Sequence, residues 1–390
     1  MPRGAVGRVI HILHIVGARP NFVKVAAVFS ALAGRRGVCQ TVVHTGQHYD
    51  HNMSHVFFTQ LGIPPADENL GVGSGSHAKQ TAEVMARIEP VLLSRNPDLV
   101  LVYGDVNSTL AAALVCGKLG IPVGHVEAGL RSFDRTMPEE INRVLTDQLS
   151  TLLFTPSEDA NENLQREGIP ADQIHLCGNV MIDSLVRLLP AASKPSNLRV
   201  PDSYALVTLH RPSNVDDTEW LRGMLGALSN LTQELPIIFP VHPRTRERMS
   251  SLGYKTDSNG IQLCDPLPYL DFLYLEKNAM VVITDSGGIQ EETTFLGVRC
   301  LTVRENTERP ITVRVGTNTI VGRDPERLSQ ELQDVLRGSI KKGAIPPLWD
   351  AHASDRIADL IVSWCAGHSD GGFASASNSY RLQPPERVMT

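Results

Sequence analysis

Three carboxylates lie where they could act together on one substrate. Asp105 follows the apolar run LVLVYG, Glu127 follows VGHV, and Glu139 lies in the segment PEEINR. Directed toward one cleft, such a set can supply a general acid, a general base and an anion that stabilises developing positive charge. Glu139 also has a simpler explanation, because an acid in a first helical turn complements the helix dipole.

A glycine-containing segment, DSGGIQEE at 285–292, has the character of a phosphate site. It follows the apolar run MVVIT and opens a segment of helical period. Glycines let a backbone approach a ligand closely, and the unpaired N–H groups at a helix start favour phosphate. Glu291 and Glu292 lie one turn into the helix, where a carboxylate can hold ribose hydroxyls. The alternative is that Ser286 or Asp285 simply caps the helix.

Cations and imidazoles follow other apolar runs. Arg19 and Lys24 come after the first run, a natural place to neutralise a diphosphate, and Arg309 lies in the later segment ENTERP. His210 and His242 end two further runs. Each charge alone would pass as a solvated surface residue. Their recurrence at corresponding places in both halves of the chain indicates a shared cleft.

The elements that must position these residues alternate between short apolar runs and segments of helical period. This alternation is typical of parallel sheets covered by helices on both faces. In such sheets ligands bind outside the carboxyl ends of the strands, so polar residues at strand ends are the site candidates. We expect strands at 8–17, 38–45, 97–105, 121–128, 151–155 and 203–210, and further strands in the runs IIFPVHP, IQLCDP, AMVVITDS and RCLTVRE. We expect helices at 21–34, 77–94, 138–149, 157–167 and 353–365, and one that begins at Ser108.

The strand and helix pattern restarts after a polar segment rich in Pro and Ser, 190–202. A chain of 390 residues usually forms two domains or more. We therefore expect an α/β protein with two Rossmann-like domains whose parallel sheets face a central cleft. The first domain, over 1–189, would hold the carboxylates, and the second, over 200–350, would bind the nucleotide. The polar, aperiodic stretch 368–390 is expected to be a disordered tail.

Composition narrows the class of protein. The net charge of −6 gives no support to a nucleic-acid or anionic-membrane partner. The six cysteines are scattered without a C-x-x-C pair, as free thiols in a reducing compartment would be. The N-terminal apolar run is short, contains His11 and His14, and lacks a cleavage site, so a buried strand is a better interpretation than a signal peptide. These features predict a cytoplasmic protein.

Two sequence patterns superficially resemble cofactor-binding motifs but lack residues that those motifs require. The segment GVGSGS at 71–76 follows no strand and lacks the third glycine of a dinucleotide fingerprint, so we expect a loop and no NAD. The series His44, His48, His51 and His55 has no acid or cysteine to complete a ligand set. A polar cleft wall is favoured over a metal site, and no cofactor is expected.

Nine segments, taken in order, resemble the non-hydrolysing UDP-N-acetylglucosamine 2-epimerases. The resemblance extends from about residue 8 to about residue 365. The segments are GARPNFVK (17–24), YGDVNSTLAAAL (103–114), GHVEAGLRS (124–132), PEEINR (138–143), CGNVMIDSL (177–185), TLHRPSN (208–214), PVHPRTR (240–246), TDSGGIQEE (284–292) and ENTERPITVRVGTNTIVG (305–322).

This resemblance implies a glycosyltransferase-B-like fold, a homodimer, and a C-terminal helix at 353–367 that packs back on the first domain. It also implies reversible inversion at C2 of the sugar, by elimination of UDP to a 2-acetamidoglucal and re-addition, without NAD or an obligatory metal. Which acid removes the C2 proton stays open. Carried over by position, the implied catalytic residues are Asp105, Glu127, Glu139 and His210; those for UDP are Arg19, Lys24, His242, Ser286, Gly287, Gly288, Glu292 and Arg309; and those for a second site or the cleft are Gln47, His48 and Arg211.

The sequence departs from the family pattern in three motifs and in the loop between Arg131 and Pro138, which is shorter than in well-studied members. Well-studied bacterial members read G-T-R-P-E-A-I-K, H-R-R-E and Q-H-R-E-M where this chain has GARPNFVK, HRPS and QHYD. These segments border the second UDP-sugar site that activates some members, so that property stays open. The alternatives are a hydrolysing epimerase that releases N-acetylmannosamine and UDP, a glycosyltransferase on the same fold, and a UDP-sugar sensor. The acid set argues against the last two.

Overall fold

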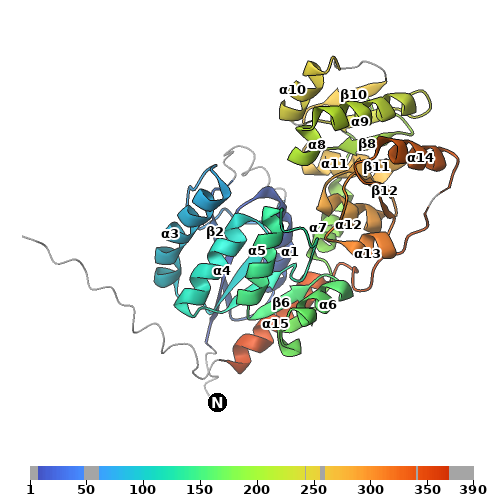
Figure 1. Cartoon of the computed structure of the whole chain (residues 1–390). Helices are drawn as coiled ribbons and strands as arrows, with labels where there is room; N and C mark the ends of the chain where they lie inside the picture. Colours follow the sequence, from blue (N-terminus) through green and yellow to red (C-terminus); the bar gives the residue numbers. More distant parts are fainter. Residues whose placement is uncertain (1–7, 48–60, 242, 255–259, 340, 369–390) are drawn as a thin grey trace, which may run out of the picture. The chain divides into compact units, whose positions relative to one another are not determined.

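The computed structural model describes residues 8–47, 61–241, 243–254, 260–339 and 341–368. The chain forms two compact units (Figure 1). The first contains residues up to Gly129, Asp134–Val180 and the segment from Ala353 onward; the second contains Leu130–Phe133 and Met181–His352. The chain thus enters the second unit at Met181, ahead of the segment 190–202 where the sequence suggested a boundary. The expected tail, apart from His368, lies outside the described residues.

The first unit is built on a seven-stranded parallel sheet in the order β3-β2-β1-β4-β5-β6-β7. Its strands are short and mostly apolar, and all five residues of β4 (LVLVY) are buried. Burial on both faces explains why they read as continuous apolar runs. The bounds are β1 Ile10–Val16, β2 Val38–His44, β3 Glu68–Asn69, β4 Leu99–Tyr103, β5 Val123–Val126, β6 Leu152–Thr155 and β7 Ile174–Leu176.

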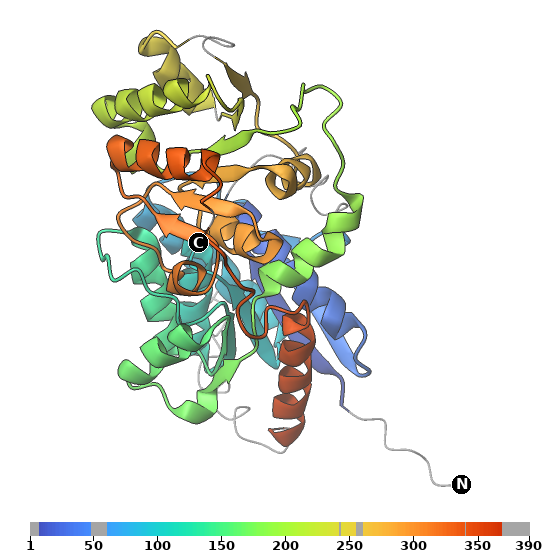
Figure 2. The ribbon, with the colours of Figure 1, turned by 90° about the vertical axis from the view of Figure 1, so that its right-hand side faces the viewer.

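Helices on the first sheet are α1 (Arg19–Ala33), α3 (His77–Arg95), α4 (Asn107–Leu119), α5 (Pro138–Leu149), α6 (Glu158–Arg166) and α15 (Ala353–Gly367), with a 3₁₀ turn η1 at Ala171–Gln173. Although α15 is the last element, it packs on α1 (Figure 1, Figure 2). Its Ile357 and Ile361 are buried, and Arg35 after α1 pairs with Asp359 at 2.9 Å. An exposed ion pair adds about 0–1 kcal/mol, so apolar burial contributes most of the docking energy.

Helix α5 has an inverted amphipathic pattern. Its buried side carries Glu140, Arg143 and Asp147, whereas Leu145 is 44% exposed. Together with Ile141 and Leu149, which are 47% and 36% exposed, Leu145 forms a row at four-residue spacing that we call the α5 stripe. A globular helix normally turns its apolar side inward. We therefore expect the polar side of α5 to form polar contacts inside the unit.

The second unit holds a six-stranded parallel sheet in the order β10-β9-β8-β11-β12-β13. Its strands are β8 Ala205–Thr208, β9 Ile237–Pro240, β10 Ile261–Cys264, β11 Val281–Thr284, β12 Arg299–Thr302 and β13 Asn318–Ile320. Its helices are α7 Val180–Leu188, α8 Pro212–Val215, α9 Thr218–Leu231, α10 Pro243–Ser251, α11 Tyr269–Asn278, α12 Gly287–Leu296, α13 Pro310–Arg314 and α14 Pro325–Leu336, with a 3₁₀ turn η2 at Leu189–Ala191.

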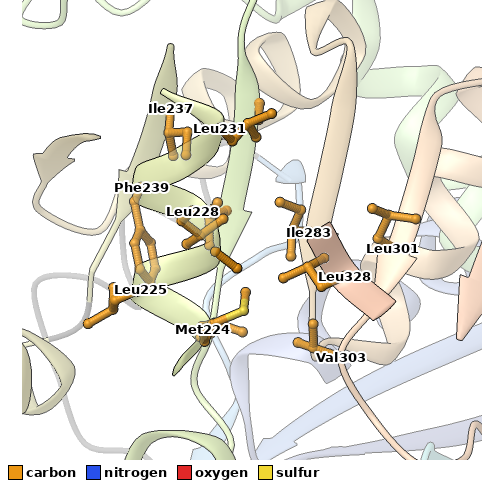
Figure 3. Packing of buried hydrophobic residues seen from close by; sticks show 14 of the residues in the cluster. Met224, Leu225, Leu228, Leu231, Ile237, Phe239, Ile283, Leu301, Val303 and Leu328 are labelled. Carbon is orange, nitrogen blue, oxygen red and sulfur yellow. The ribbon is translucent and has the colours of Figure 1, made fainter. Parts of the chain in front are cut away.

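The main core of this unit lies between α9, α14 and the sheet. Leu228 from α9 and Leu328 from α14 meet Phe239 of β9 and Ile283 of β11 (Figure 3). Each of these side chains is at most 1% exposed. Burying one large apolar side chain stabilises a fold by about 1.5–3 kcal/mol, so this layer gives β8 and β11 a rigid base.

The expected fold class, α/β with two parallel sheets, is confirmed. The expected longer strands and helices are present within a few residues of their predicted limits. The segment 71–76 is a loop, as expected. Three strands of only two or three residues (β3, β7 and β13) were not predicted. The six cysteines all lie among the described residues, and no disulfide joins any two of them.

Candidate active site

The order of strands in each sheet reverses at one place, and the candidate residues follow the strands on either side of it. In the first unit β1 lies between β2 and β4, and in the second β8 lies between β9 and β11. Ligands of open parallel sheets bind at such a switch point, outside the carboxyl ends of the strands. Helix α1 follows β1, Asp105 follows β4, His210 follows β8, and Asp285 follows β11.

Lys24 and Glu127 form a buried ion pair in the first unit. They are 6% and 7% exposed. Glu127 has a φ of 76°, a left-handed conformation that costs a non-glycine residue about 1–2 kcal/mol. At Gly104, where φ is 61°, an added Cβ would lie 2.8 Å from Lys24 Nζ. The tight turn and the strained backbone together bring the Glu127 carboxylate to the lysine, which the sequence had suggested for a diphosphate.

Asp105 is held by a second buried cation. Arg143 of α5 donates from Nη2 to Asp105 Oδ2 and from Nη1 to Glu140 Oε2, the latter at 2.5 Å. Asn142 Nδ2 donates to the Asp105 carbonyl at 2.8 Å. The polar side of α5 therefore fixes both the backbone and the carboxylate of Asp105. Arg143 was not predicted as a site residue, although it ends the motif PEEINR.

Glu139 differs from the other two acids. It lies in the first turn of α5 and is partly exposed. Among the residues that the structure describes, no cation pairs with its carboxylate. The three acids expected to act together thus fall into two kinds: two that are paired with buried cations, and one that is not.

In the second unit His210 is oriented by Asp285. The completely buried Asp285 carboxylate accepts the Arg211 N–H at 2.9 Å and lies 2.8 Å from His210 Nδ1. Asn214 Nδ2 also donates to it, at 3.1 Å. Burial favours the neutral acid, but the hydrogen bond and charge of His210 and the other donors outweigh it, so the pKa of Asp285 is lowered. The imidazole consequently donates from Nδ1 and turns Nε2 away, with a side chain 55% exposed.

The start of α12 is shaped by a charged network, and neither Ser286 nor Asp285 caps it. Ser286 occupies the N-cap position without a side-chain capping bond, so the capping explanation was wrong. A Cβ at Gly287 would overlap the Arg309 guanidinium and lie 2.7 Å from Glu308 Oε1. Arg309 pairs with Glu308 at 2.5 Å and with Glu291 at 3.0 Å. The glycine is therefore required for the arginine to reach the helix start.

Glu292 takes part in a buried acid cluster. Its Oε1 accepts the Tyr269 hydroxyl at 2.6 Å. Burial raises the pKa of Glu292, and burial followed by the charge of Glu292 raises the pKa of Glu276 well above its usual range. In Glu276, which the sequence did not indicate, burial and the neighbouring carboxylate both favour the neutral form.

Other expected site residues fall into two groups. Gln47 is buried and accepts the Ser108 hydroxyl at 2.8 Å, and Arg211 Nε donates to the Asp285 carbonyl at 3.1 Å. His48 and His242 lie outside the described residues, as does the side chain of Arg19.

The described part of the chain provides neither a cluster of metal ligands nor a membrane-spanning helix. The described residues contain no group of three or more His, Cys, Asp or Glu that could hold a metal ion. Of the expected histidine series, His44 stacks on Phe22 with ring centroids 5.4 Å apart, and the others lie outside the described residues. No helix there is long and apolar enough to cross a membrane.

Asn21, which departs from the family pattern, has a local structural role. Its Oδ1 accepts the Ala18 N–H at 3.1 Å, and its Nδ2 donates to the Tyr103 carbonyl at 2.6 Å. The start of α1 is thereby tied to the end of β4. The departure is compatible with an intact switch point.

Comparison with known proteins places these features in context. A family model described as UDP-N-acetylglucosamine 2-epimerase matches residues 30–362. A Methanocaldococcus jannaschii protein named UDP-N-acetylglucosamine 2-epimerase is 44% identical over 360 residues, covering 89% of this chain and 98% of that protein. A crystal structure of the UDP-GlcNAc 2-epimerase of that organism, in complex with UDP-GlcNAc and UDP, matches with a TM-score of 0.84 at 43% identity, covering 91% of this chain and 100% of that one.

A relative with a different printed substrate is nearly as similar. The UDP-2,3-diacetamido-2,3-dideoxy-D-glucuronate 2-epimerase of Pseudomonas aeruginosa is 42% identical over 354 residues, covering 90% of this chain and 99% of that protein. The two-sheet architecture is thus the glycosyltransferase-B-like one shared by these enzymes.

Proposed function

The chain belongs to the UDP-N-acetylglucosamine 2-epimerase family, and from that premise we propose that it interconverts UDP-N-acetylglucosamine and UDP-N-acetylmannosamine. The observation that carries the proposal is the set of acids that follow β4 and β5 in the first unit. Two of them, Asp105 and Glu127, are paired with buried cations, whereas no cation in the described part of the chain pairs with Glu139. The similarity to the Methanocaldococcus jannaschii enzyme supports the same substrate.

The chemistry requires anions before it requires a base. The C2–H of the sugar is barely acidic, so the C1–O bond must break early, with its electron pair passing to the β-phosphate oxygen of UDP. The sugar then gains oxocarbenium character, which fixed carboxylates stabilise electrostatically. Arg143 and Lys24 keep Asp105 and Glu127 in the charged form that this role needs.

We assign Glu139 as the base that removes the proton from C2 of the sugar. Asp105 or Glu127 would have to break an ion pair to accept a proton, whereas Glu139 would not. Loss of the C2 proton to Glu139 completes the 2-acetamidoglucal. Re-addition of UDP at C1, with protonation of C2 from the opposite face, gives the epimer.

The second unit supplies the groups for UDP. The N–H groups of Ser286, Gly287 and Gly288 at the start of α12, with Arg309 beside them, suit the diphosphate. His210 presents Nε2 to the departing phosphate because Asp285 occupies Nδ1. The acid cluster around Glu292 suits the ribose hydroxyls. Placement of sugar and nucleotide in one cleft between the domains stays a prediction of the sequence.

A second substrate is favoured by one comparison. The Pseudomonas aeruginosa relative is 42% identical over 90% of this chain, close to the 44% of the first relative. UDP-2,3-diacetamido-2,3-dideoxy-glucuronate is therefore the alternative sugar nucleotide. It requires the same elimination and re-addition at C1 and C2.

In the deciding experiment, UDP-N-acetylglucosamine and UDP-2,3-diacetamido-2,3-dideoxy-glucuronate are each incubated with the purified protein and no other addition. The products are then followed by NMR. Formation of UDP-N-acetylmannosamine with intact nucleotide supports the proposal. Free N-acetylmannosamine with UDP would identify a hydrolysing enzyme, and turnover of the glucuronate alone would reassign the substrate. Glu139→Gln, prepared in parallel, controls for contaminating host epimerase. Loss of turnover on chelation, restored by one metal, would contradict the expected independence of metal.

A further inference from the structure

A histidine in the middle of the first sheet faces two hydrogen-bond acceptors. His125 lies on β5 and is 0% exposed. Its Nε2 lies 2.8 Å from the carbonyl oxygen of Gly104, and its Nδ1 lies 2.6 Å from Oδ1 of Asp147 on α5. Asp147 is also 0% exposed. The strands on either side place the apolar residues Val102 and Leu153 beside His125, so Asp147 is the titratable group that faces it in these contacts.

This geometry determines the number of protons on the ring. A carbonyl oxygen cannot donate, so Nε2 must carry a hydrogen. The partner of Nδ1 is a carboxylate whose other oxygen accepts the Gly129 N–H at 3.1 Å. With Asp147 ionised, Nδ1 donates as well and the ring is an imidazolium. Its position beside the last turn of α5 is one where the helix dipole favours a cation.

The same sheet contains a matched neutral histidine. His14 on β1 is also 0% exposed, but its Nδ1 lies 2.7 Å from the Tyr103 hydroxyl, which can donate, and its Nε2 lies 3.0 Å from Gln40 Oε1. One proton satisfies both contacts. Burial lowers the pKa of His14 to about 4. The difference between the two histidines therefore arises from their partners and not from their exposure.

His125 and Asp147 contact the turns that carry two of the proposed acids. The Gly104 carbonyl immediately precedes Asp105, and Gly129 follows Glu127 by two residues. Gly104 has a φ of 61°, Glu127 of 76° and Gly129 of 81°. The left-handed conformation of Glu127, which is not a glycine, persists only where surrounding contacts hold it. His125 holds the first turn and Asp147 holds the second.

We propose that His125 and Asp147 form a buried imidazolium–carboxylate pair that positions the turns bearing Asp105 and Glu127. Both are positioning residues, since neither lies at a strand end where substrate would bind. The positioning role of the pair in catalysis rests on the proposed function, whereas its protonation state is independent of that function.

The protonation state is tested on the wild-type protein by NMR with ¹⁵N-labelled histidine at pH 7.5, with His125→Gln used to assign the signal. We expect both ring nitrogens of His125 to carry hydrogen, while His14 carries one on Nε2 only. A His125 ring with a single N–H would overturn the proposal. Because this readout needs no turnover, an inactive wild type would count against the proposed function and leave this result intact.

The positioning role is tested by kinetics. His125→Phe keeps a ring but no donor, and His125→Gln keeps a donor at the Nε2 position. We expect kcat to fall about 10²-fold in the first, the effect of a displacement of about 1 Å at a reacting group, with substantial rescue in the second. KM and UDP affinity should change less than about twofold in both, because UDP is assigned to the other unit.

His14→Gln is the packing control, since it also removes a buried ring from the same sheet. It should lower the melting temperature and leave kcat unchanged. If His125→Phe likewise lowered only the melting temperature, with kcat within about twofold of wild type, the pair would be purely structural and the positioning role would be overturned.

Discussion

Replacing Asp285 by asparagine should slow the reaction, although the Asp285 side chain is completely buried. The carboxylate accepts the His210 ring, the Arg211 N–H and the Asn214 amide while completely buried. An asparagine offers one acceptor oxygen and turns an NH₂ group toward a donor. If the oxygen stays with Arg211 and Asn214, His210 Nδ1 loses its acceptor and the ring shifts its proton to Nε2.

The size of the effect follows from these contacts. A wrong imidazole tautomer at a proton-transferring or phosphate-facing histidine lowers kcat by about 10²–10⁴-fold. Each charged hydrogen bond lost in a buried site costs about 1–3 kcal/mol of stability. We therefore expect Asp285→Asn to lose kcat by that factor and to unfold at lower urea concentration, with the chain still folded at 25 °C.

The pH dependence of stability gives an independent check. The pKa of Asp285 is lowered from 3.8 in the folded protein, so its contribution to stability is fully present above the unfolded value and is lost as pH falls through the folded one. The difference in urea midpoint between wild type and Asp285→Asn should be constant from pH 7 to about 5 and shrink below about 4. A variant with wild-type kcat, or a difference that grows on acidification, would refute the assignment.

Four further outcomes are expected. Turnover in D₂O should place deuterium at C2 of the product and, with time, at C2 of the recovered substrate, and a product that keeps its original C2 hydrogen would exclude elimination. Glu127→Gln should cut kcat by about 10²–10⁴-fold while UDP binding survives. Glu292→Ala should weaken UDP binding by about 1–3 kcal/mol, measured by calorimetry, and unchanged affinity would remove Glu292 from the site. If the homodimer expected from the sequence buries the exposed α5 stripe, Leu145→Glu should dissociate it, and light scattering that gives the same mass for variant and wild type would contradict that interface.

The positions of the strand-end residues were predictable because the fold itself places them. Apolar runs bounded by polar residues identify β4, β8 and β11, and the rule for parallel sheets brings Asp105, His210 and Asp285 to the carboxyl ends of these strands. That inference requires only the order of elements along the chain.

The partners of these residues were not predictable by the same rule. Arg143, Asp147 and Glu276 lie inside helices, where the strand-end criterion discards polar residues as solvent-facing. All three are buried, and their roles arise from which helix side faces the sheet. In α5 that side is polar, so the apolar periodicity points to the wrong side. Two local signals were present: a histidine within the apolar run VGHV, which is unusual for a central strand, and the position of Arg143 at the end of the motif PEEINR.

The packing of α15 on α1 also bears on how the chain is made. The first unit begins at the N-terminus but is completed only by Ala353–Gly367, whereas nearly all of the second unit is Met181–His352. Domains usually fold in the order in which they leave the ribosome. Here the second unit is the first whose sequence is complete. The nascent first unit meanwhile carries a helix whose docking partner has not yet been translated, so premature termination before residue 353 would leave that surface open to chaperones and proteases.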